Sequence, residues 1–225
     1  MSWDQWIRTV EIEPSLYAAD FSRLGDQVDT LLRAGARAFH FDIGDGHFVE
    51  PVTIGPIVLE SIAPLVHREG GAVDVHLMVD DPEHYFGALQ SAGADSVTFH
   101  LEAVSDPRSV AAKARERGFQ VGLAIKPETA VQDALEASEG FDLVLCMSIH
   151  PGYSGQEFMP GALERVQWLR SALPPQMHLQ VDGGITNDNI RSVCDAGADL
   201  IVCGSAIFGM EDLPRAYRRL VQLLA

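Results

Sequence analysis

The sequence is poor in basic residues. It has 16 Lys and Arg against 32 Asp and Glu, which gives a formal net charge of −16 at pH 7. Nucleic acids and anionic membranes attract proteins through clusters of Lys and Arg. This charge balance excludes both as expected partners. It also means that any phosphate site depends on local hydrogen-bond donors rather than on overall charge.

Cysteine is scarce as well, since Cys146, Cys194 and Cys203 lie far apart and form no CxxC pair. An odd number of dispersed cysteines in a chain of 225 residues argues against a disulfide framework. The apolar runs are shorter than the roughly 20 residues that a membrane helix needs. The N-terminal residues lack the basic and apolar regions of a signal peptide. We therefore expect a soluble, cytoplasmic protein with reduced thiols.

Short apolar segments alternate with amphipathic segments along the whole chain, and no linker or low-complexity segment divides it. The apolar segments predict eight strands, over Val10–Leu16, Ala38–Asp42, Val73–Met78, Ser96–His100, Gln120–Ile125, Leu143–Met147, His178–Val181 and Leu200–Cys203. The amphipathic segments predict eight helices, over Arg23–Ala34, Ile57–Leu65, Glu83–Ala92, Pro107–Arg117, Thr129–Ala137, Gly161–Ala172, Asn187–Asp195 and Leu213–Leu224.

Strict alternation of strands and helices is typical of parallel βα units. A doubly wound open sheet would carry a G-x-G-x-x-G fingerprint after its first strand, but residues 17–20 read Tyr-Ala-Ala-Asp. Eight units fit a closed barrel, which typically takes ~250 residues. The sequence therefore predicts an α/β protein with a TIM (β/α)8 barrel of parallel strands, formed by a single domain over residues 1–225.

Polar side chains occur at the ends of three predicted strands, where barrel enzymes have their active sites. His40 and Asp42 share one face of the second strand, because residues two apart point the same way. His76 lies in the third strand, and Asp182 follows the seventh. Two imidazoles and two carboxylates suit one divalent metal ion, namely zinc, iron, manganese or cobalt. The alternative is that these side chains only satisfy core hydrogen bonds or cap turns.

Glycine is concentrated after the last three predicted strands, in the segments 150–156, 182–184 and 203–206, none of which contains Lys or Arg. Backbone N–H groups of glycine approach an anion closely, and barrel enzymes often bind phosphate after strands seven and eight. Ser205 offers a hydroxyl donor in addition. We expect a phosphate site here, with ordinary turn glycines as the alternative.

These motifs, in this order and over nearly all units, resemble those of the D-ribulose-5-phosphate 3-epimerase family. The matching segments are Pro14-Ser15-Leu16 with Ala19-Asp20-Phe21, His40-x-Asp42-x-x-Asp45-Gly46-His47-Phe48-Val49, Asp74-x-His76-Leu77-Met78-Val79, Gly122-Leu123-Ala124-Ile125-x-Pro127, Met147-x-x-x-Pro151-Gly152, Gly155-Gln156-x-Phe158, Val181-Asp182-Gly183-Gly184-Ile185 and Gly204-Ser205-Ala206-Ile207-Phe208.

The resemblance implies a metal-dependent interconversion of D-ribulose 5-phosphate and D-xylulose 5-phosphate by a homo-oligomer. It implies that His40, Asp42, His76 and Asp182 bind the metal ion and that Asp42 and Asp182 are also the acid/base pair. Inversion at C3 needs two such groups, because a proton leaves one face of the carbon and another arrives on the opposite face. The implied substrate-binding residues are Ser15, His76, Met78, Gly152, Tyr153, Ser154, Gly155, Gly183, Gly184, Gly204 and Ser205.

Several positions depart from the usual pattern of the family, among them Tyr17, which follows Leu16 where the family usually reads P-S-I-L. Gly44 stands where Met is common, which predicts a roomier or more hydrated mouth, while His150 replaces Asn and Ser154 replaces Gly. These departures keep open a 3-epimerase of another ketose phosphate, such as a hexulose 6-phosphate. Further alternatives are a non-catalytic phosphosugar-binding barrel and a sugar-phosphate lyase, although lyases of similar fold tend to have an Asp-x-Lys pair where this chain has His40-x-Asp42.

Overall fold

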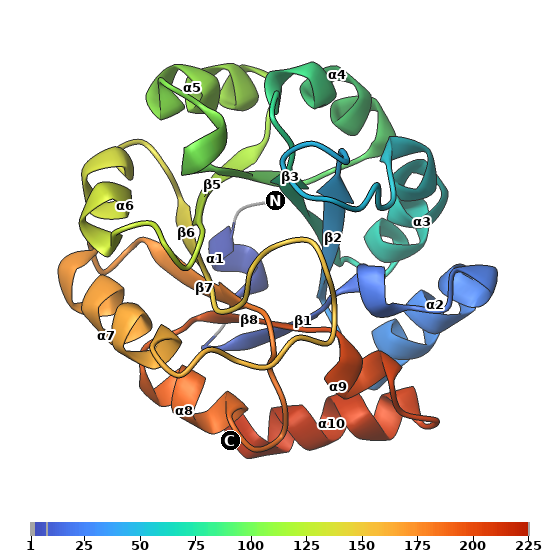
Figure 1. Cartoon of the computed structure of the whole chain (residues 1–225). Coiled ribbons are helices and arrows are strands. Elements are labelled where there is room, and N and C mark those ends of the chain that lie inside the picture. Colours follow the sequence, from blue (N-terminus) through green and yellow to red (C-terminus); the bar gives the residue numbers. More distant parts are fainter. Residues whose placement is uncertain (1–2, 8, 225) are drawn as a thin grey trace.

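The computed structural model describes residues 3–7 and 9–224, and within them eight parallel strands form a ring (Figure 1). The strands lie in the order β1-β8-β7-β6-β5-β4-β3-β2. A parallel bridge between Ser15 and His40 brings the end of β1 beside β2 and closes the ring. The predicted TIM barrel is thus confirmed. The strands are β1 (Glu11–Pro14), β2 (Ala38–Gly44), β3 (Ala72–Met78), β4 (Ser96–His100), β5 (Gln120–Ile125), β6 (Leu143–Met147), β7 (His178–Asp182) and β8 (Leu200–Cys203).

Helices connect successive strands and surround the ring (Figure 1). They are α2 (Leu24–Ala34), α3 (Pro56–Arg68), α4 (Glu83–Ala92), α5 (Pro107–Glu116), α6 (Val131–Ala137), α7 (Ala162–Ala172), α8 (Ile190–Asp195), α9 (Ser205–Phe208) and α10 (Leu213–Leu224), together with the 3-10 turns η1 (Leu16–Ala18), η2 (Phe21–Arg23) and η3 (Leu101–Ala103). Helix α1 (Trp3–Trp6) precedes β1 and lies within the outline of the ring (Figure 1). Helices α2 to α8 and α10 lie where the sequence predicts helices.

Alternate side chains of each strand face either the apolar core beneath the helices or the interior of the barrel. In β3, Val73, Val75 and Leu77 belong to the apolar core that the strands share with the surrounding helices. Asp74 and His76 alternate with them and therefore point into the ring. The interior of the barrel is consequently polar along β3, although every residue of that strand is buried.

Helix α1 closes the amino-terminal end of the ring. Trp3 and Trp6 are buried there in one apolar cluster with Ala72, Leu143 and Leu200, which begin β3, β6 and β8. Indole rings of the described residues thus fill this end of the barrel, and the pocket described below opens at the carboxyl-terminal ends of the strands.

The first strand is shorter than the sequence predicts. It ends at Pro14 because Leu16 begins a 3-10 turn, which is closed by a hydrogen bond from the Ala19 N–H to the Leu16 carbonyl (3.1 Å). Helices α1 and α9 do not appear among the sequence predictions, since four residues are too few to show a 3.6-residue period.

The described part of the chain has no helix that combines the length and the apolar character needed to cross a membrane. The predicted single domain covers residues 1–225, and residues 1, 2, 8 and 225 lie outside those that the structure describes. We retain one domain as our proposal, because the ring takes strands from both ends of the chain.

At the closed end of the barrel, His178 is expected to make stability depend on pH. Its Nε2 lies 3.2 Å from Asp4 Oδ1, and its Nδ1 lies 3.6 Å from Asp199 Oδ2. Burial alone would lower the pKa of His178, but the hydrogen bonds and charges of Asp199 and Asp4 raise it. The resulting stabilisation is fully present below the unfolded pKa of ~6.5 and is lost as the pH rises through the folded pKa.

Urea titrations of the wild type and of His178→Gln at pH 5.5 and 8.5 would measure this effect. We expect the free energy of unfolding of the wild type to exceed that of the variant by about 0.5–1 kcal/mol at the lower pH and by little at the higher pH. The effect is small because such partly exposed ion pairs are weak. If the free energies of unfolding of the wild type and the variant differed by the same amount at both pH values, the imidazole of His178 would stabilise the protein through packing alone.

Candidate active site

The four predicted metal ligands meet at the carboxyl-terminal end of the barrel. One ligand atom from each of His40, Asp42, His76 and Asp182 lies within 4.8 Å of the other three. Asp42 Oδ1 lies 3.2 Å from His40 Nε2 and 3.1 Å from His76 Nδ1, and Asp182 Oδ2 lies 4.0 Å from His76 Nδ1. The register of β2 and β3 places Asp42 beside His76, while Asp182 arrives from β7 across the ring.

These donor atoms fit a divalent cation. His40 Nε2 is fully buried and, although Asp42 Oδ1 lies 3.2 Å away, it makes no well-aligned hydrogen bond to any described residue. A buried polar atom without a partner is costly, and a metal ion would use its lone pair. Imidazole nitrogens together with carboxylate oxygens are ligands that zinc, iron, manganese and cobalt all accept.

The two carboxyl groups of the cluster have opposite pKa shifts. Burial alone would raise the pKa of Asp42, but the charge of His40 and the hydrogen bond from His76 hold it well below the usual range. Burial and the neighbouring charge of Asp42 raise the pKa of Asp182 to about 6. Asp42 is therefore ionised under conditions in which Asp182 still takes up a proton, as a pair with separate acid and base roles requires.

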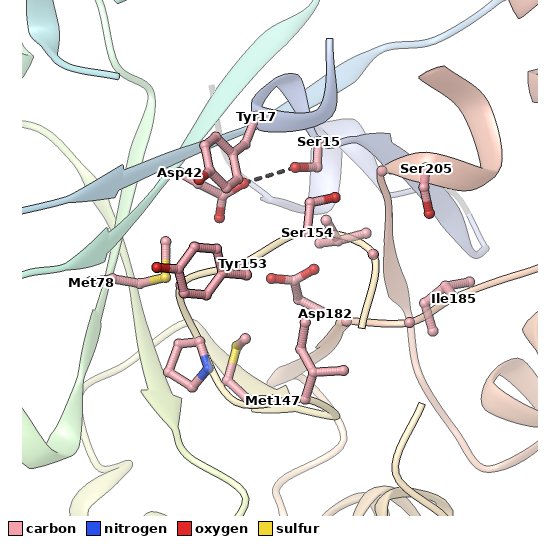
Figure 2. A pocket seen from close by; sticks show the side chains of 18 residues that line it. Ser15, Tyr17, Asp42, Met78, Met147, Tyr153, Ser154, Asp182, Ile185 and Ser205 are labelled. Atoms are coloured by element: carbon pink, nitrogen blue, oxygen red, sulfur yellow. Dashed lines mark hydrogen bonds between the residues drawn. The ribbon is translucent and has the colours of Figure 1, made fainter. Parts of the chain in front are cut away.

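A pocket opens beside these carboxyl groups, and Figure 2 shows Asp42 and Asp182 reaching into it from different strands. The Ser15 hydroxyl donates a hydrogen bond to Asp42 Oδ2 (2.8 Å) and so orients that carboxylate. His76 does not line the pocket, because it is fully buried. The other predicted substrate residues all line it, namely Ser15, Met78, Gly152, Tyr153, Ser154, Gly155, Gly183, Gly184, Gly204 and Ser205.

Glycine gives one side of the pocket its shape. Gly183 and Gly184 have φ angles of 117° and 65°, which L side chains rarely adopt. A Cβ on Gly184 would lie 2.5 Å from the backbone nitrogen of Phe158. Helix α9 begins at Ser205 directly after β8, and no Lys or Arg lines the pocket among the described residues. An anion at this side would be held by N–H and O–H groups.

The prediction of a wider mouth at Gly44 is wrong. A Cβ at this position would lie 2.8 Å from Val49 Cγ2 and 2.9 Å from the Pro51 carbonyl oxygen. The segment after β2 folds back onto the strand here, and the Thr53 hydroxyl donates to the Asp42 carbonyl (2.8 Å) while accepting from the Gly44 N–H (2.7 Å). Glycine is required by this close backbone approach and leaves no extra space for substrate.

Sequence reasoning missed a buried polar layer beneath the cluster. Asp74 Oδ2 accepts hydrogen bonds from Gln180 Nε2 (2.9 Å) and lies 3.1 Å from His40 Nδ1, and Gln180 also donates to Glu13. Glu13, Asp74 and Gln180 each lie two residues before a predicted site residue of the same strand or its end. The two-residue period could have placed them on the inward face. The other lining residues that were missed are Tyr17, Met147, Ile149, Pro151, Ile185 and Val202.

Comparison with known proteins identifies the family. The profile of the ribulose-phosphate 3 epimerase family matches residues 11–208. Ribulose-phosphate 3-epimerase 2 of Cupriavidus necator is 38% identical over 224 residues, covering 96% of this chain and 92% of the relative. The ribulose-phosphate 3-epimerase of Schizosaccharomyces pombe is 40% identical over 198 residues, with 88% and 86% covered.

Solved structures share the fold at low sequence identity. The 3-hexulose-6-phosphate synthase of Salmonella typhimurium superposes with a TM-score of 0.73 at 18% identity, covering 96% of this chain and 98% of that one. Orotidine 5'-phosphate decarboxylase of Pyrococcus horikoshii gives a TM-score of 0.68 at 16% identity, with 95% and 98% covered. The sequence matches carry the assignment: this chain belongs to the ribulose-phosphate 3-epimerase family of enzymes.

Proposed function

We propose that the protein interconverts D-ribulose 5-phosphate and D-xylulose 5-phosphate by moving protons to and from C3. The observation that carries this proposal is the pair Asp42 and Asp182, which reach one pocket from β2 and β7 with opposite pKa shifts. The names of the relatives supply the substrate, since both are called ribulose-phosphate 3-epimerases.

In this proposal Asp42 and Asp182 act from opposite sides of C3. One carboxylate accepts the proton that leaves C3, and the other carboxylic acid delivers a proton to the opposite face. Their roles exchange in the reverse direction, because each group ends the reaction in the protonation state from which its partner began. Ser15 keeps Asp42 in place through its hydrogen bond to Oδ2.

His40, Asp42, His76 and Asp182 would hold one divalent metal ion. When bound, such an ion supplies Lewis-acid stabilisation of the negative charge that develops on the substrate oxygens, worth several kcal/mol. Met78 and Met147 line the pocket near the carboxyl groups and provide an apolar wall. This wall excludes water from the reacting carbon and strengthens the electrostatic interactions there.

The phosphate group would bind at the glycine side of the pocket, against Gly183, Gly184, Gly204 and Ser205. Backbone N–H groups and the Ser205 hydroxyl are suitable donors, and glycine allows their close approach. This mode of binding needs no basic side chain, which agrees with a protein of net charge −16.

Exchange of the C3 hydrogen in heavy water tests the proposal. We expect NMR to show deuterium at C3 of both pentulose 5-phosphates together with their interconversion, and slower exchange on hexulose 6-phosphates. Cleavage of a carbon–carbon bond would indicate a lyase instead. Binding of the sugar phosphate without any exchange would indicate a non-catalytic barrel.

A further inference from the structure

We propose that two buried relays hold His40 and His76 in opposite tautomers, so that His40 offers Nε2 and His76 offers Nδ1 to the same cation. Asp74 is the positioning residue for His40, and the pair His100 and Glu102 positions His76. This inference rests on the proposed metal site and adds residues that act through its ligands.

The relay of His40 is the contact of its Nδ1 to Asp74. This contact is shorter than the other two contacts of the same nitrogen, to Gln180 Nε2 (3.5 Å) and Glu13 Oε2 (3.8 Å). The ring Nδ1 lies 3.1 Å from Asp74 Oδ2. A carboxylate only accepts hydrogen bonds, so Nδ1 carries the hydrogen and the lone pair of the neutral ring is on Nε2. That atom is the buried nitrogen that makes no well-aligned hydrogen bond among the described residues.

Asp74 cannot rotate away from this contact, because both of its oxygens are engaged. The Ser96 hydroxyl donates to Oδ1 (2.7 Å), and Gln180 Nε2 donates to Oδ2 (2.9 Å). Asp74 is therefore a fixed acceptor behind His40.

The relay of His76 is longer and runs in the opposite sense. His76 Nε2 lies 2.9 Å from His100 Nε2, so only one of these two nitrogens carries the shared hydrogen. His100 Nδ1 lies 3.1 Å from Glu102 Oε2, which makes Nδ1 the protonated nitrogen of His100. A cation at His76 Nδ1 leaves Nε2 as the only nitrogen of that ring that can carry the shared hydrogen.

A neutral His100 with its hydrogen on Nδ1 accepts at Nε2, and His76 must therefore donate from its own Nε2. In the cation-bound protein the lone pair of His76 is then on Nδ1. Without the cation this nitrogen is placed to donate to Asp42 Oδ1 (3.1 Å), and it lies 4.0 Å from Asp182 Oδ2. The backbone N–H of Lys126 (2.8 Å) and the Thr129 hydroxyl both donate to Glu102 Oε1 and fix the outer end of the relay.

The layer beneath His40 is better explained as this support than as a second ion site. Ligand atoms of Glu13, His40 and Asp74 do lie within 4.8 Å of one another. The amide nitrogen of Gln180, however, donates hydrogen bonds to both Glu13 and Asp74. An N–H donor thus stands between the carboxylates, where a cation would have to bind.

Glu102→Gln is the sharpest test, because it should reverse the longer relay. The Lys126 N–H and the Thr129 hydroxyl both require an acceptor, so the single oxygen of Gln would face them. Its NH2 group would then face His100 Nδ1, which becomes the acceptor and moves the shared hydrogen to His100 Nε2. His76 would be left with a hydrogen on Nδ1, facing the cation. Loss of such an outer partner typically weakens metal binding 10–100-fold.

Titration with Co2+ alone, without substrate, would measure this loss. The matched control is Asp142→Asn, since Asp142 also accepts a backbone N–H (from Val121, 2.9 Å) and is similarly exposed, but at the other end of its strand. We expect Co2+ binding to be weakened 10–100-fold in Glu102→Gln and unchanged in Asp142→Asn. Wild-type affinity in Glu102→Gln would overturn the relay and leave the proposed function intact. A wild type that binds no Co2+ would overturn the metal site itself.

A second measurement needs no variant. Long-range 1H–15N spectra of the wild type with Zn2+ alone should show His40 protonated at Nδ1 and His76 protonated at Nε2. The same tautomer in both rings would refute the inference even if Glu102→Gln failed to fold.

Discussion

Asp182→Asn is expected to lower the rate of epimerisation by about 10²–10⁴-fold, the range over which a positioned acid or base contributes. An amide of the same shape lines the pocket but neither delivers nor accepts the proton at C3. Asp42→Asn should lower the rate of epimerisation by at least as much, because Asp42 also contacts His40, His76 and Ser15. Turnover in both directions, measured with a coupled assay, checks the expectation.

The two-base scheme predicts a second effect of Asp182→Asn. Asp42 remains able to remove the proton that faces it, so one epimer should still exchange its C3 hydrogen slowly with heavy water. The other epimer should exchange far more slowly, and inversion of either epimer should show the same loss of rate, about 10²–10⁴-fold. Asp188→Asn is the matched control, because Asp188 is exposed in the loop that follows the same strand. Equal exchange of both epimers by Asp182→Asn would show that another group serves its side of C3.

The cluster of candidate metal ligands was predictable because it follows from two regularities of the sequence. The alternation of strands and helices indicates a barrel, and the two-residue period of a strand places His40 and Asp42 on one inward face. Joining them to Asp182 needed only the rule that all strand ends of a barrel meet at one mouth. The structure brings these residues within 4.8 Å of one another.

The supporting residues were harder to predict, because their roles depend on contacts between strands. Nothing in the sequence near Asp74 says that it meets His40 of the neighbouring strand and Gln180 from across the ring. The prediction of a wider mouth at Gly44 was wrong for a related reason. Its environment is set by the backbone of Pro51, which folds back onto it, so a comparison of residue types at that position alone was misleading.

Removal of the divalent ion is expected to abolish turnover and to lower the melting temperature. Asp42, Asp74 and Asp182 place carboxyl groups close together in an acidic protein, and a cation offsets the mutual repulsion that contributes to the raised pKa of Asp182. An ion at 100 times its Kd stabilises the folded state by about 2.7 kcal/mol. Each kcal/mol shifts Tm by about 2–4 °C in a chain of this size, so chelation should lower Tm by roughly 5–11 °C.

Differential scanning calorimetry and turnover should be measured on the chelated protein and after addition of zinc, manganese, cobalt or ferrous iron. Activity and Tm should return together, because in the proposed mechanism the same four side chains bind the ion and surround the reacting carbon. Asp42→Asn provides the control. This variant lacks one charged candidate ligand, so its Tm should rise far less than that of the wild type when any of the ions is added. Full turnover by protein shown to be free of metal would contradict the prediction, and the carboxyl pair would then have to stabilise the reaction unaided.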